Sequence, residues 1–159
     1  MDIDLKNVVE FLQENAFCFT TVEDGKPKVR PFCTAMEFEE KLFVIMSETM
    51  HPEQKDIRPV WKQVIANPNI AICSWDKDRK WMRITGTLKE DARIEVKRKM
   101  IADNRIMDDF TTNEVDDFQR IFAIEDMQID LRGDCAKCCC DGGFCTHDDC
   151  RQRNKFFKE

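Results

Sequence analysis

Hydrophobic positions in the middle of the chain form two apolar runs separated by one helical stripe. Residues 42–46 are uninterrupted apolar residues whose β-branched and aromatic content favours a buried strand. Residues 56–66 carry apolar side chains at helical spacing, and the Asn-Pro pair at 67–68 ends that helix because a residue before proline avoids the α region. Residues 70–75 form the second apolar run. This stretch therefore predicts a strand, a loop, a helix and a strand.

The preceding segment predicts a helix and a β-hairpin. Apolar residues recur at i, i+3, i+4 and i+7 within residues 4–15, which indicates an amphipathic helix. Residues 17–22 and 28–36 predict two strands, joined by a turn whose Asp-Gly pair at 24–25 tolerates positive φ. Pro31 cannot donate to a ladder, so we expect the second strand to lie at a sheet edge or to contain a bulge.

The second half of the chain continues the β pattern. Residues 81–88 alternate between a polar and an apolar face, residues 92–102 predict a helix, and residues 111–114 resemble a helix cap. Residues 120–125 and 127–131 predict two closing strands around a turn. Because tight turns join most of the strands, we expect a mainly β, largely antiparallel fold with peripheral helices, such as a small closed or split barrel.

Composition narrows the classes of protein to which the chain can belong. Its 159 residues fit one domain, and a net charge of −6 lacks the basic footprint of nucleic-acid binding, so we expect no nucleic-acid partner. No apolar run approaches the roughly 18 residues of a membrane span, and the amino terminus lacks signal-peptide features. We therefore expect a cytoplasmic protein with no membrane partner. In that reducing compartment, its nine cysteines favour thiols or metal ligands over disulfides.

The loop and helix between the two central apolar runs are rich in polar and basic residues. A serine, a histidine and three cations lie close together in sequence: Ser47, His51, Lys55, Arg58 and Lys62. Guanidinium and ammonium groups beside a serine hydroxyl suit a phosphate-bearing ligand. The alternative is that these cations only solvate the outer face of a helix, as charge runs commonly do.

Three ordered motifs connect the chain to a known family. They are TTVEDGKPKVRPF at 20–32, ANPN at 66–69 and KWMRITG at 80–86. In this order and spacing they resemble the pyridoxamine 5′-phosphate oxidase-like family over residues 1–133. The resemblance implies a six-stranded antiparallel split β-barrel that forms a homodimer, with flavin mononucleotide (FMN) bound at the subunit interface. Residues 1–133 are thus expected to be an FMN-binding split-barrel domain.

The resemblance also implies which residues touch the cofactor. One strand of the family runs beside the flavin, and a hydroxyl residue and a lysine of the family bind its phosphate. The lysine position falls on Arg58, whose bidentate fork can serve equally well, but extra residues before it make Lys55 a competing ligand. The matching residues are Arg30, Phe32 and Cys33 beside the flavin, and Ser47, Lys55 and Arg58 at the phosphate.

Trp81 and Arg83 match a strand that in relatives reaches toward the cofactor or the substrate pocket, often across the dimer. The alternative is a packing tryptophan and a solvated arginine. The resemblance therefore implies that Trp81 and Arg83 contact the cofactor.

These expectations favour an FMN-dependent oxidoreductase that transfers hydride or electrons to a small substrate. A flavin supplies the redox chemistry itself, so no catalytic acid or base is assigned. The carboxyl-terminal motif with which true pyridoxamine-phosphate oxidases close on substrate is not seen in this chain, so vitamin B6 oxidation is not supported. Two alternatives are a haem-binding relative, with His51 or His147 as iron ligand, and a non-enzymatic dimerisation module that binds flavin or metal.

The composition changes abruptly after Gly133. Six of the nine cysteines lie between positions 135 and 150, which predicts a metal knuckle over residues 134–150. Four thiolates can hold zinc tetrahedrally or bind an iron–sulfur cluster, and free redox-active thiols are the third possibility. Residues 151–159 form a basic tail. The expected metal ligands are Cys135, Cys138, Cys145 and Cys150.

Overall fold

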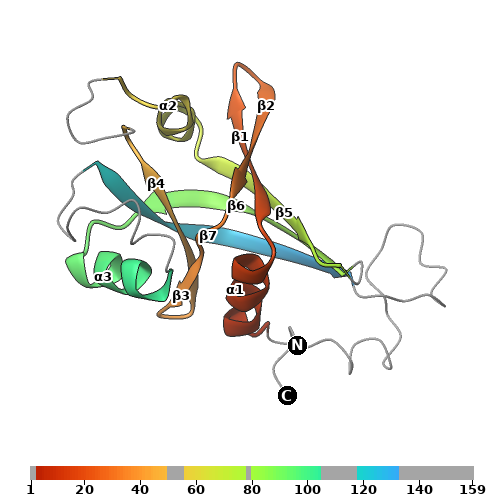
Figure 1. Ribbon diagram of the computed structural model, residues 1–159. Coiled ribbons are helices and arrows are strands. Elements are labelled where there is room, and N and C mark those ends of the chain that lie inside the picture. Colours follow the sequence, from red (N-terminus) through yellow and green to blue (C-terminus); the bar gives the residue numbers. More distant parts are fainter. Residues whose placement is uncertain (1–2, 50–55, 78–79, 105–117, 133–159) are drawn as a thin grey trace.

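One antiparallel sheet of seven strands organises the described part of the chain (Figure 1). The computed structural model describes residues 3–49, 56–77, 80–104 and 118–132. Within these ranges the sheet is open, with the strand order β2-β1-β5-β6-β7-β4-β3. The strands are β1 (Phe17–Glu23), β2 (Lys26–Phe32), β3 (Met36–Phe38), β4 (Lys41–Ser47), β5 (Asn69–Trp75), β6 (Trp81–Glu90) and β7 (Gln119–Arg132). The predicted mainly β, antiparallel class is confirmed.

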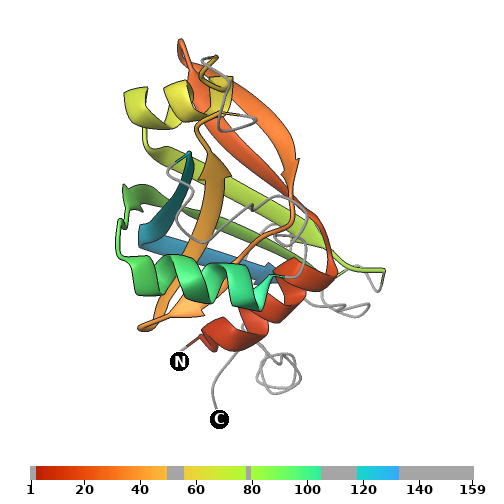
Figure 2. The same ribbon diagram turned by 60° about the vertical axis from the view of Figure 1, so that its left-hand side comes forward.

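Within the described ranges three helices lie around this sheet, and all three were predicted (Figures 1 and 2). They are α1 (Leu5–Glu14), α2 (Pro59–Ala66) and α3 (Ile94–Asp103). Asp4 caps α1 by accepting the backbone N–H of Lys6 at 3.0 Å. Proline at the first position of α2 suits the helix because its N–H would be unpaired there anyway. None of the described helices is long and apolar enough to cross a membrane. The cap predicted at 111–114 lies outside the described residues.

Two hydrophobic clusters lie on opposite faces of β4. Leu42, Val44 and Met46 belong to the larger cluster, which α1 and α2 also enter. Phe43 and Ile45 belong to a smaller cluster that includes Val96 and Met100 of α3. Burial on both faces explains why residues 42–46 are uniformly apolar instead of alternating.

The β1–β2 hairpin explains how two prolines fit into a strand. Asp24 and Gly25 have φ values of 51° and 71°, as a two-residue turn of this handedness requires. Glu23 pairs with Lys26 beside the turn, and hydrogen-bonded and non-hydrogen-bonded pairs alternate from there. Pro27 and Pro31 therefore fall at non-hydrogen-bonded positions, with their nitrogens toward the open edge. The predicted edge position of this strand is confirmed, although it ends at Phe32 rather than at residue 36.

The segment after β2 forms a short extra strand instead of extending the hairpin. β3 pairs with β4 through a turn at Glu39 and Glu40, whose φ values are 51° and 60°. Without Gly, Asn or Asp, this turn carries no sequence signal for positive φ. β3 is also why the described sheet has seven strands where the resemblance implied six.

β7 is one continuous strand, so the prediction of two strands around a turn was wrong. It pairs with β6 along its length and with β4 over Gln119–Ala123. Asp126 has a φ of 50°, and the β6–β7 register shifts between Thr85 and Thr87. These features mark a bulge, which bends the strand without reversing it. Gly86 lies opposite this bulge.

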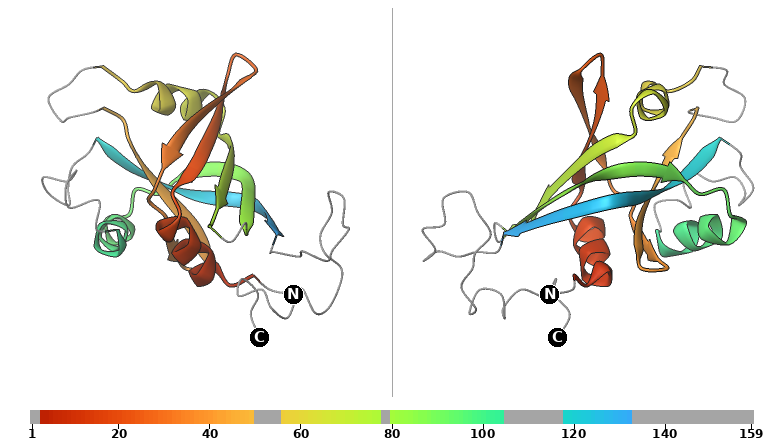
Figure 3. Two further views of the ribbon diagram at one scale, coloured as in Figure 1. Left: turned by 45° about the vertical axis from the view of Figure 1, so that its right-hand side comes forward. Right: turned by 180° about the vertical axis from the view of Figure 1, so that it is seen from behind.

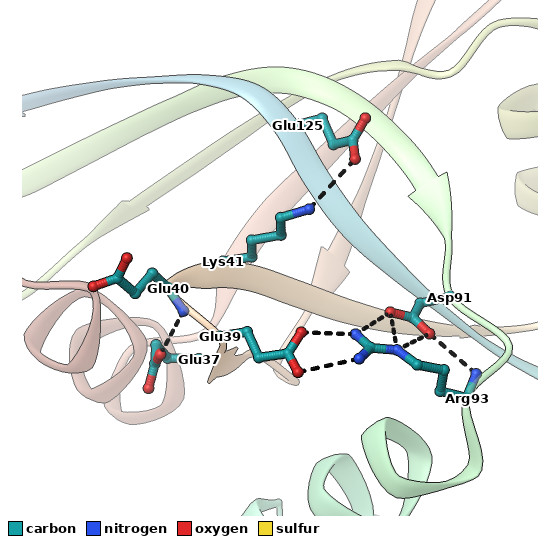
Figure 4. A network of polar contacts seen from close by, with 7 residues as sticks. All are labelled: Glu37, Glu39, Glu40, Lys41, Asp91, Arg93 and Glu125. Carbon is teal, nitrogen blue, oxygen red and sulfur yellow. Dashed lines mark hydrogen bonds and ion pairs between the residues drawn. The ribbon is translucent and has the colours of Figure 1, made fainter.

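Arg93 joins the start of α3 to the β3–β4 turn (Figure 4). Its guanidinium donates to both carboxylate oxygens of Glu39, at 3.1 and 3.0 Å, and to Asp91 at distances down to 2.8 Å. Hydrogen bonds from Arg93 hold the pKa values of Asp91 and Glu39 below their usual range, and the two carboxylates raise the pKa of Arg93. These groups are solvated, so the network fixes the geometry of the turn more than it adds stability.

We expect Gly86→Ala to destabilise the protein by about 2 kcal/mol, because overpacking beside the bulge must displace backbone. A Cβ at Gly86 would lie 2.5 Å from Ile124 Cγ2 and 2.7 Å from the Glu125 carbonyl oxygen. The control is Gly25→Ala. A Cβ at this position would have no atom within 4 Å, so the variant should lose only about 1 kcal/mol of stability, because alanine is strained at positive φ. Chemical denaturation measures both free energies of unfolding. An equal cost for the two variants would contradict the assigned clash.

Candidate cofactor site

A buried glutamine on α2 holds the side chain of Arg30 on β2. Gln63 is 4% exposed, and its Oε1 accepts from Arg30 Nη2 at 2.6 Å and from the Thr21 hydroxyl at 2.6 Å. Arg30 Nη1 also donates to Thr21 Oγ1 at 2.9 Å. Gln63 comes from α2 and Thr21 from β1, so two other elements fix the guanidinium of this β2 residue.

Glu23 and Lys28 extend this network along the hairpin. Gln63 Nε2 donates to Glu23 Oε1 at 3.1 Å, and Lys28 Nζ lies 3.2 Å from Glu23 Oε2. Hydrogen bonds from Gln63 and Lys28 hold the pKa of Glu23 below its usual range. The polar atoms of the Gln63 amide are thereby satisfied, which allows its burial.

Arg58 lies directly before α2 and within electrostatic reach of Arg30. Burial lowers the pKa of Arg30, repulsion from Arg58 lowers it further, and Glu23 opposes both effects. The backbone N–H of Arg58 donates to the Glu48 carbonyl at 2.8 Å, which places α2 beside the end of β4, where Ser47 lies half-buried. Among the described residues, no side chain pairs with the Arg58 guanidinium. The structure thus brings Arg30, Ser47 and Arg58 to one region.

Arg120 and Trp61 lie next to this region. The Arg120 guanidinium lies 5.8 Å from the centroid of a Trp61 ring, and its nitrogens lie 3.4 Å from Glu48 and 3.5 Å from Glu90. Because two carboxylates face it, Arg120 is less suited to an added anion than Arg58. Trp61 also packs edge-on against Phe122, which anchors α2 to β7.

Phe32 is the last residue of β2 and packs against the hydrophobic core, and Cys33 follows it directly. The Phe32 ring stacks on Phe19 with centroids 4.6 Å apart, and Phe32 packs against the larger cluster. Cys33 is half-buried and has a free thiol. Phe32 therefore has a packing role, whether or not it also contacts a cofactor.

Trp81 and Arg83 lie on the outer face of the sheet. The Arg83 guanidinium lies 5.4 Å from the Trp81 ring centroid and 3.2 Å from Asp130. Arg83 is directly opposite the exposed Cys73 and so faces the outer side, whereas Arg30 is opposite the buried Phe19 and faces inward. Within one chain, the structure does not bring Trp81 and Arg83 to the arginine pair.

Several expected ligands lie outside the described residues. Lys55 and both histidines, His51 and His147, are among them, as are the four expected metal ligands Cys135, Cys138, Cys145 and Cys150. In the ranges that the structure describes, no group of three or more His, Cys, Asp or Glu side chains could hold a metal ion.

Sequence reasoning missed Gln63 and Thr21. A single glutamine in a short amphipathic helix is normally an exposed residue, and only its position beside Val60 and Val64 on the buried side of α2 could have indicated its burial. Thr21 alternates with Phe17 and Phe19 as an inward-facing position of β1, and this was the available signal.

We expect Gln63→Leu to destabilise the protein by about 1–3 kcal/mol, because it removes the acceptor of Arg30 and Thr21 in a buried environment. Lys62→Leu is the control, since Lys62 is exposed on the same helix and the same side chain is introduced. Thermal and chemical unfolding measure the difference. If both variants unfold at the same midpoint, the network does not stabilise the fold.

Comparison with solved structures identifies the fold. No protein-family model and no curated protein matches the chain. A NimC/NimA family protein from Clostridium acetobutylicum is similar over 80% of this chain and 84% of its own, with 26% identity and a TM-score of 0.70. A candidate pyridoxamine 5′-phosphate oxidase from Listeria innocua has 15% identity and a TM-score of 0.57 over 79% and 98% of the two chains. HutZ, a haem storage protein from Vibrio cholerae, has 19% identity and a TM-score of 0.58 over 84% and 95%. The chain thus has the split-barrel fold of the pyridoxamine 5′-phosphate oxidase-like proteins, as its motifs predicted.

Proposed function

We propose that this protein binds FMN at the start of α2 and acts as a flavin-dependent oxidoreductase on a small substrate. The observation that carries the proposal is the fixed Arg30 guanidinium with Arg58 within electrostatic reach. The fixed Arg30 guanidinium and the Arg58 guanidinium, which is unpaired among the described residues, form a phosphate-binding arrangement beside the half-buried Ser47, and the fold and motifs support FMN as the phosphate-bearing group.

The charges in this region fit a phosphate dianion. Burial is the main cause of the lowered pKa of Arg30, and repulsion from Arg58 lowers that pKa further. A bound dianion would offset the repulsion between the two arginines, and the Arg58 guanidinium could bind it through two N–H groups. No described side chain pairs with the Arg58 guanidinium, whereas Gln63 and Thr21 already orient the guanidinium of Arg30. Arg58 and Ser47 would therefore hold the phosphate directly, and Arg30 would complete the charge balance. Lys55 remains a competing ligand.

When bound, the flavin supplies hydride or single-electron transfer. The chain's own residues bind and orient it: Gln63 fixes Arg30, and the Glu48 carbonyl fixes the backbone of Arg58. Phe32 closes the adjacent core and excludes water from it. No described residue is assigned as a proton donor.

We also propose that two copies of the chain associate. Trp81 and Arg83 are on the outer face of the sheet, whereas Arg30 is on the inner face, so any cofactor that they contact belongs to the other copy. Val29 and Trp75 are 62% and 75% exposed on the same outer side of the sheet, where a second copy would cover them. A homodimer with cofactor sites at its interface satisfies both observations.

The carboxyl-terminal part remains a separate proposal. Residues 134–150 would form a knuckle in which Cys135, Cys138, Cys145 and Cys150 hold zinc or an iron–sulfur cluster, followed by the basic tail 151–159. A cluster would extend electron transfer from the flavin, whereas zinc would serve as a structural clip.

Replacing Arg58 should weaken FMN binding more than riboflavin binding. We expect Arg58→Ala to raise the Kd of FMN about 10- to 100-fold, because a charge-assisted contact of about 1.5–3 kcal/mol is lost, and to leave the Kd of riboflavin, which lacks phosphate, nearly unchanged. Quenching of flavin fluorescence measures both constants. Lys99→Ala on α3 makes the same charge change away from the site and should alter neither. Equal weakening for both flavins would show that Arg58 does not bind phosphate.

The absorption spectrum of anaerobically purified protein separates the cofactor hypotheses. We expect two flavin bands that bleach with dithionite, and an additional brown shoulder if the tail holds an iron–sulfur cluster. A sharp haem band would support the alternative suggested by HutZ, with His51 or His147 as ligand. Colourless protein that takes up no added FMN would refute the oxidoreductase and leave a non-enzymatic dimerisation module.

A further inference from the structure

Two cysteines face each other on the outer side of the sheet. Cys18 of β1 and Cys73 of β5 are directly opposite in an antiparallel pair, and both are exposed with free thiols. The neighbouring pair, Phe19 and Ile72, is fully buried in the larger cluster. Because side chains alternate between faces, burial of that pair fixes both thiols on the outer face. The views in Figures 1 and 3 show these two strands side by side.

The hairpin turn determines the spacing of the two thiols. In β1, residues 19, 21 and 23 form hydrogen-bonded pairs with β2, so residues 18 and 20 direct their backbone groups toward β5. Cys18 and Cys73 are therefore a hydrogen-bonded antiparallel pair, with Cα atoms about 5.5 Å apart. The Cβ atoms of directly opposite residues lie about 4.5–5.5 Å apart, and hydrogen-bonded pairs lie toward the upper end of this range.

This spacing suits a bridging ion better than a disulfide. The two Cα–Cβ bonds leave the same face nearly parallel, so the sulfur atoms can stand about 4.5–5.5 Å apart without moving the backbone. Two thiolate–metal bonds of about 2.3 Å placed in a line span about 4.6 Å. A disulfide instead requires sulfur atoms about 2.05 Å apart and Cβ atoms about 3.5–4.5 Å apart, so a pair at the wide end of the strand range would have to close by about 1 Å.

We propose that Cys18 and Cys73 form a two-thiolate site for a soft, low-coordinate cation, Cu(I) in particular. Soft thiolate ligands select Cu(I), zinc and iron–sulfur clusters. Structural zinc and the clusters need four protein ligands, and the described residues offer no such set, which leaves Cu(I). The site is separate from the arginine pair, and it does not depend on flavin binding.

Binding would replace two thiol protons with one Cu(I), and no electron would be transferred. The product is a bis-thiolate centre with one net negative charge. Arg83 is directly opposite Cys73 on the other side of β5, so its guanidinium supplies a positive charge in the same cross-strand row. Asp130, the next residue of that row, pairs with Arg83 at 3.2 Å and so offsets part of that charge.

The test measures alkylation of individual cysteines in the full-length, reduced protein without oxygen. Iodoacetamide labelling is followed by mass spectrometry of peptides, with and without Cu(I) buffered by bicinchoninate. Because coordination blocks the nucleophilic thiolate, we expect Cu(I) to slow labelling of both Cys18 and Cys73 at least about tenfold. Because the labelling rate is measured for each cysteine separately, Cu(I) that binds to the cysteines of residues 134–150 does not affect the interpretation of Cys18 and Cys73. Cys33 is the internal control, and zinc at the same free concentration should protect neither Cys18 nor Cys73.

Reciprocal variants show whether the two thiols act together. In Cys18→Ser, labelling of Cys73 should proceed at the same rate with and without Cu(I), and Cys73→Ser should likewise expose Cys18. Both positions are exposed, so the variants should keep the unfolding midpoint of the parent. A second copy on this face would slow labelling in both conditions, so the measured quantity is the ratio of the two rates. Unchanged ratios in the parent, protection of Cys73 that survives Cys18→Ser, or a peptide cross-linked by a Cys18–Cys73 disulfide would overturn the proposal.

Discussion

The pairing of β7 with both β6 and β4 is the constraint on which the rest of the fold depends. It joins the group β2-β1-β5-β6 to the pair β4-β3, which no other described strand connects. A straight strand could not follow both neighbours around a curved sheet, and the bulge at Asp126 supplies the bend. Gly86 permits that bulge because any side chain would meet Ile124 and the backbone of Glu125. The position of β4, and hence of everything that follows it, rests on this local contact.

The same pairing of β7 with β4 and β6 determines the geometry of the candidate cofactor site. β4 ends at Ser47 beside the first residue of β7, and the Glu48 carbonyl then receives the N–H of Arg58. The start of α2 is therefore set by the β4–β7 pair, while its buried side is set by Gln63 against β1 and β2. Arg30 and Arg58 meet only because the two halves of the sheet are joined. Like charges are tolerated there because Gln63, Thr21 and Glu23 already stabilise one of them.

The sequence predicted the parts of this arrangement that have local signals. The helices followed from apolar periodicity, and the β1–β2 hairpin followed from its Asp-Gly pair and from Pro31. The β3–β4 turn was missed because Glu39 and Glu40 adopt positive φ without a residue that favours it, and Arg93 holds Glu39 from a distant element. The bulge in β7 was taken for a turn because the residues of a bulge and of a turn look alike until the partner strand is known. Gln63 was missed for a similar reason, since its partners are far away in sequence.

The juxtaposition of Cys18 and Cys73 on the outer face follows partly from the alternation of inward and outward residues along β1 and β5. Phe17, Phe19 and Thr21 must face inward, as must Ile70, Ile72 and Ser74, so the intervening residues of β1 and β5 face outward. Once Phe19 is placed opposite Ile72, Cys18 and Cys73 must stand opposite each other. Their alternation can be read from the sequence, but the pairing cannot, because it depends on the register between strands about fifty residues apart. The same core contact that stabilises the sheet therefore positions the two thiols, so their juxtaposition requires no stabilising interaction of its own.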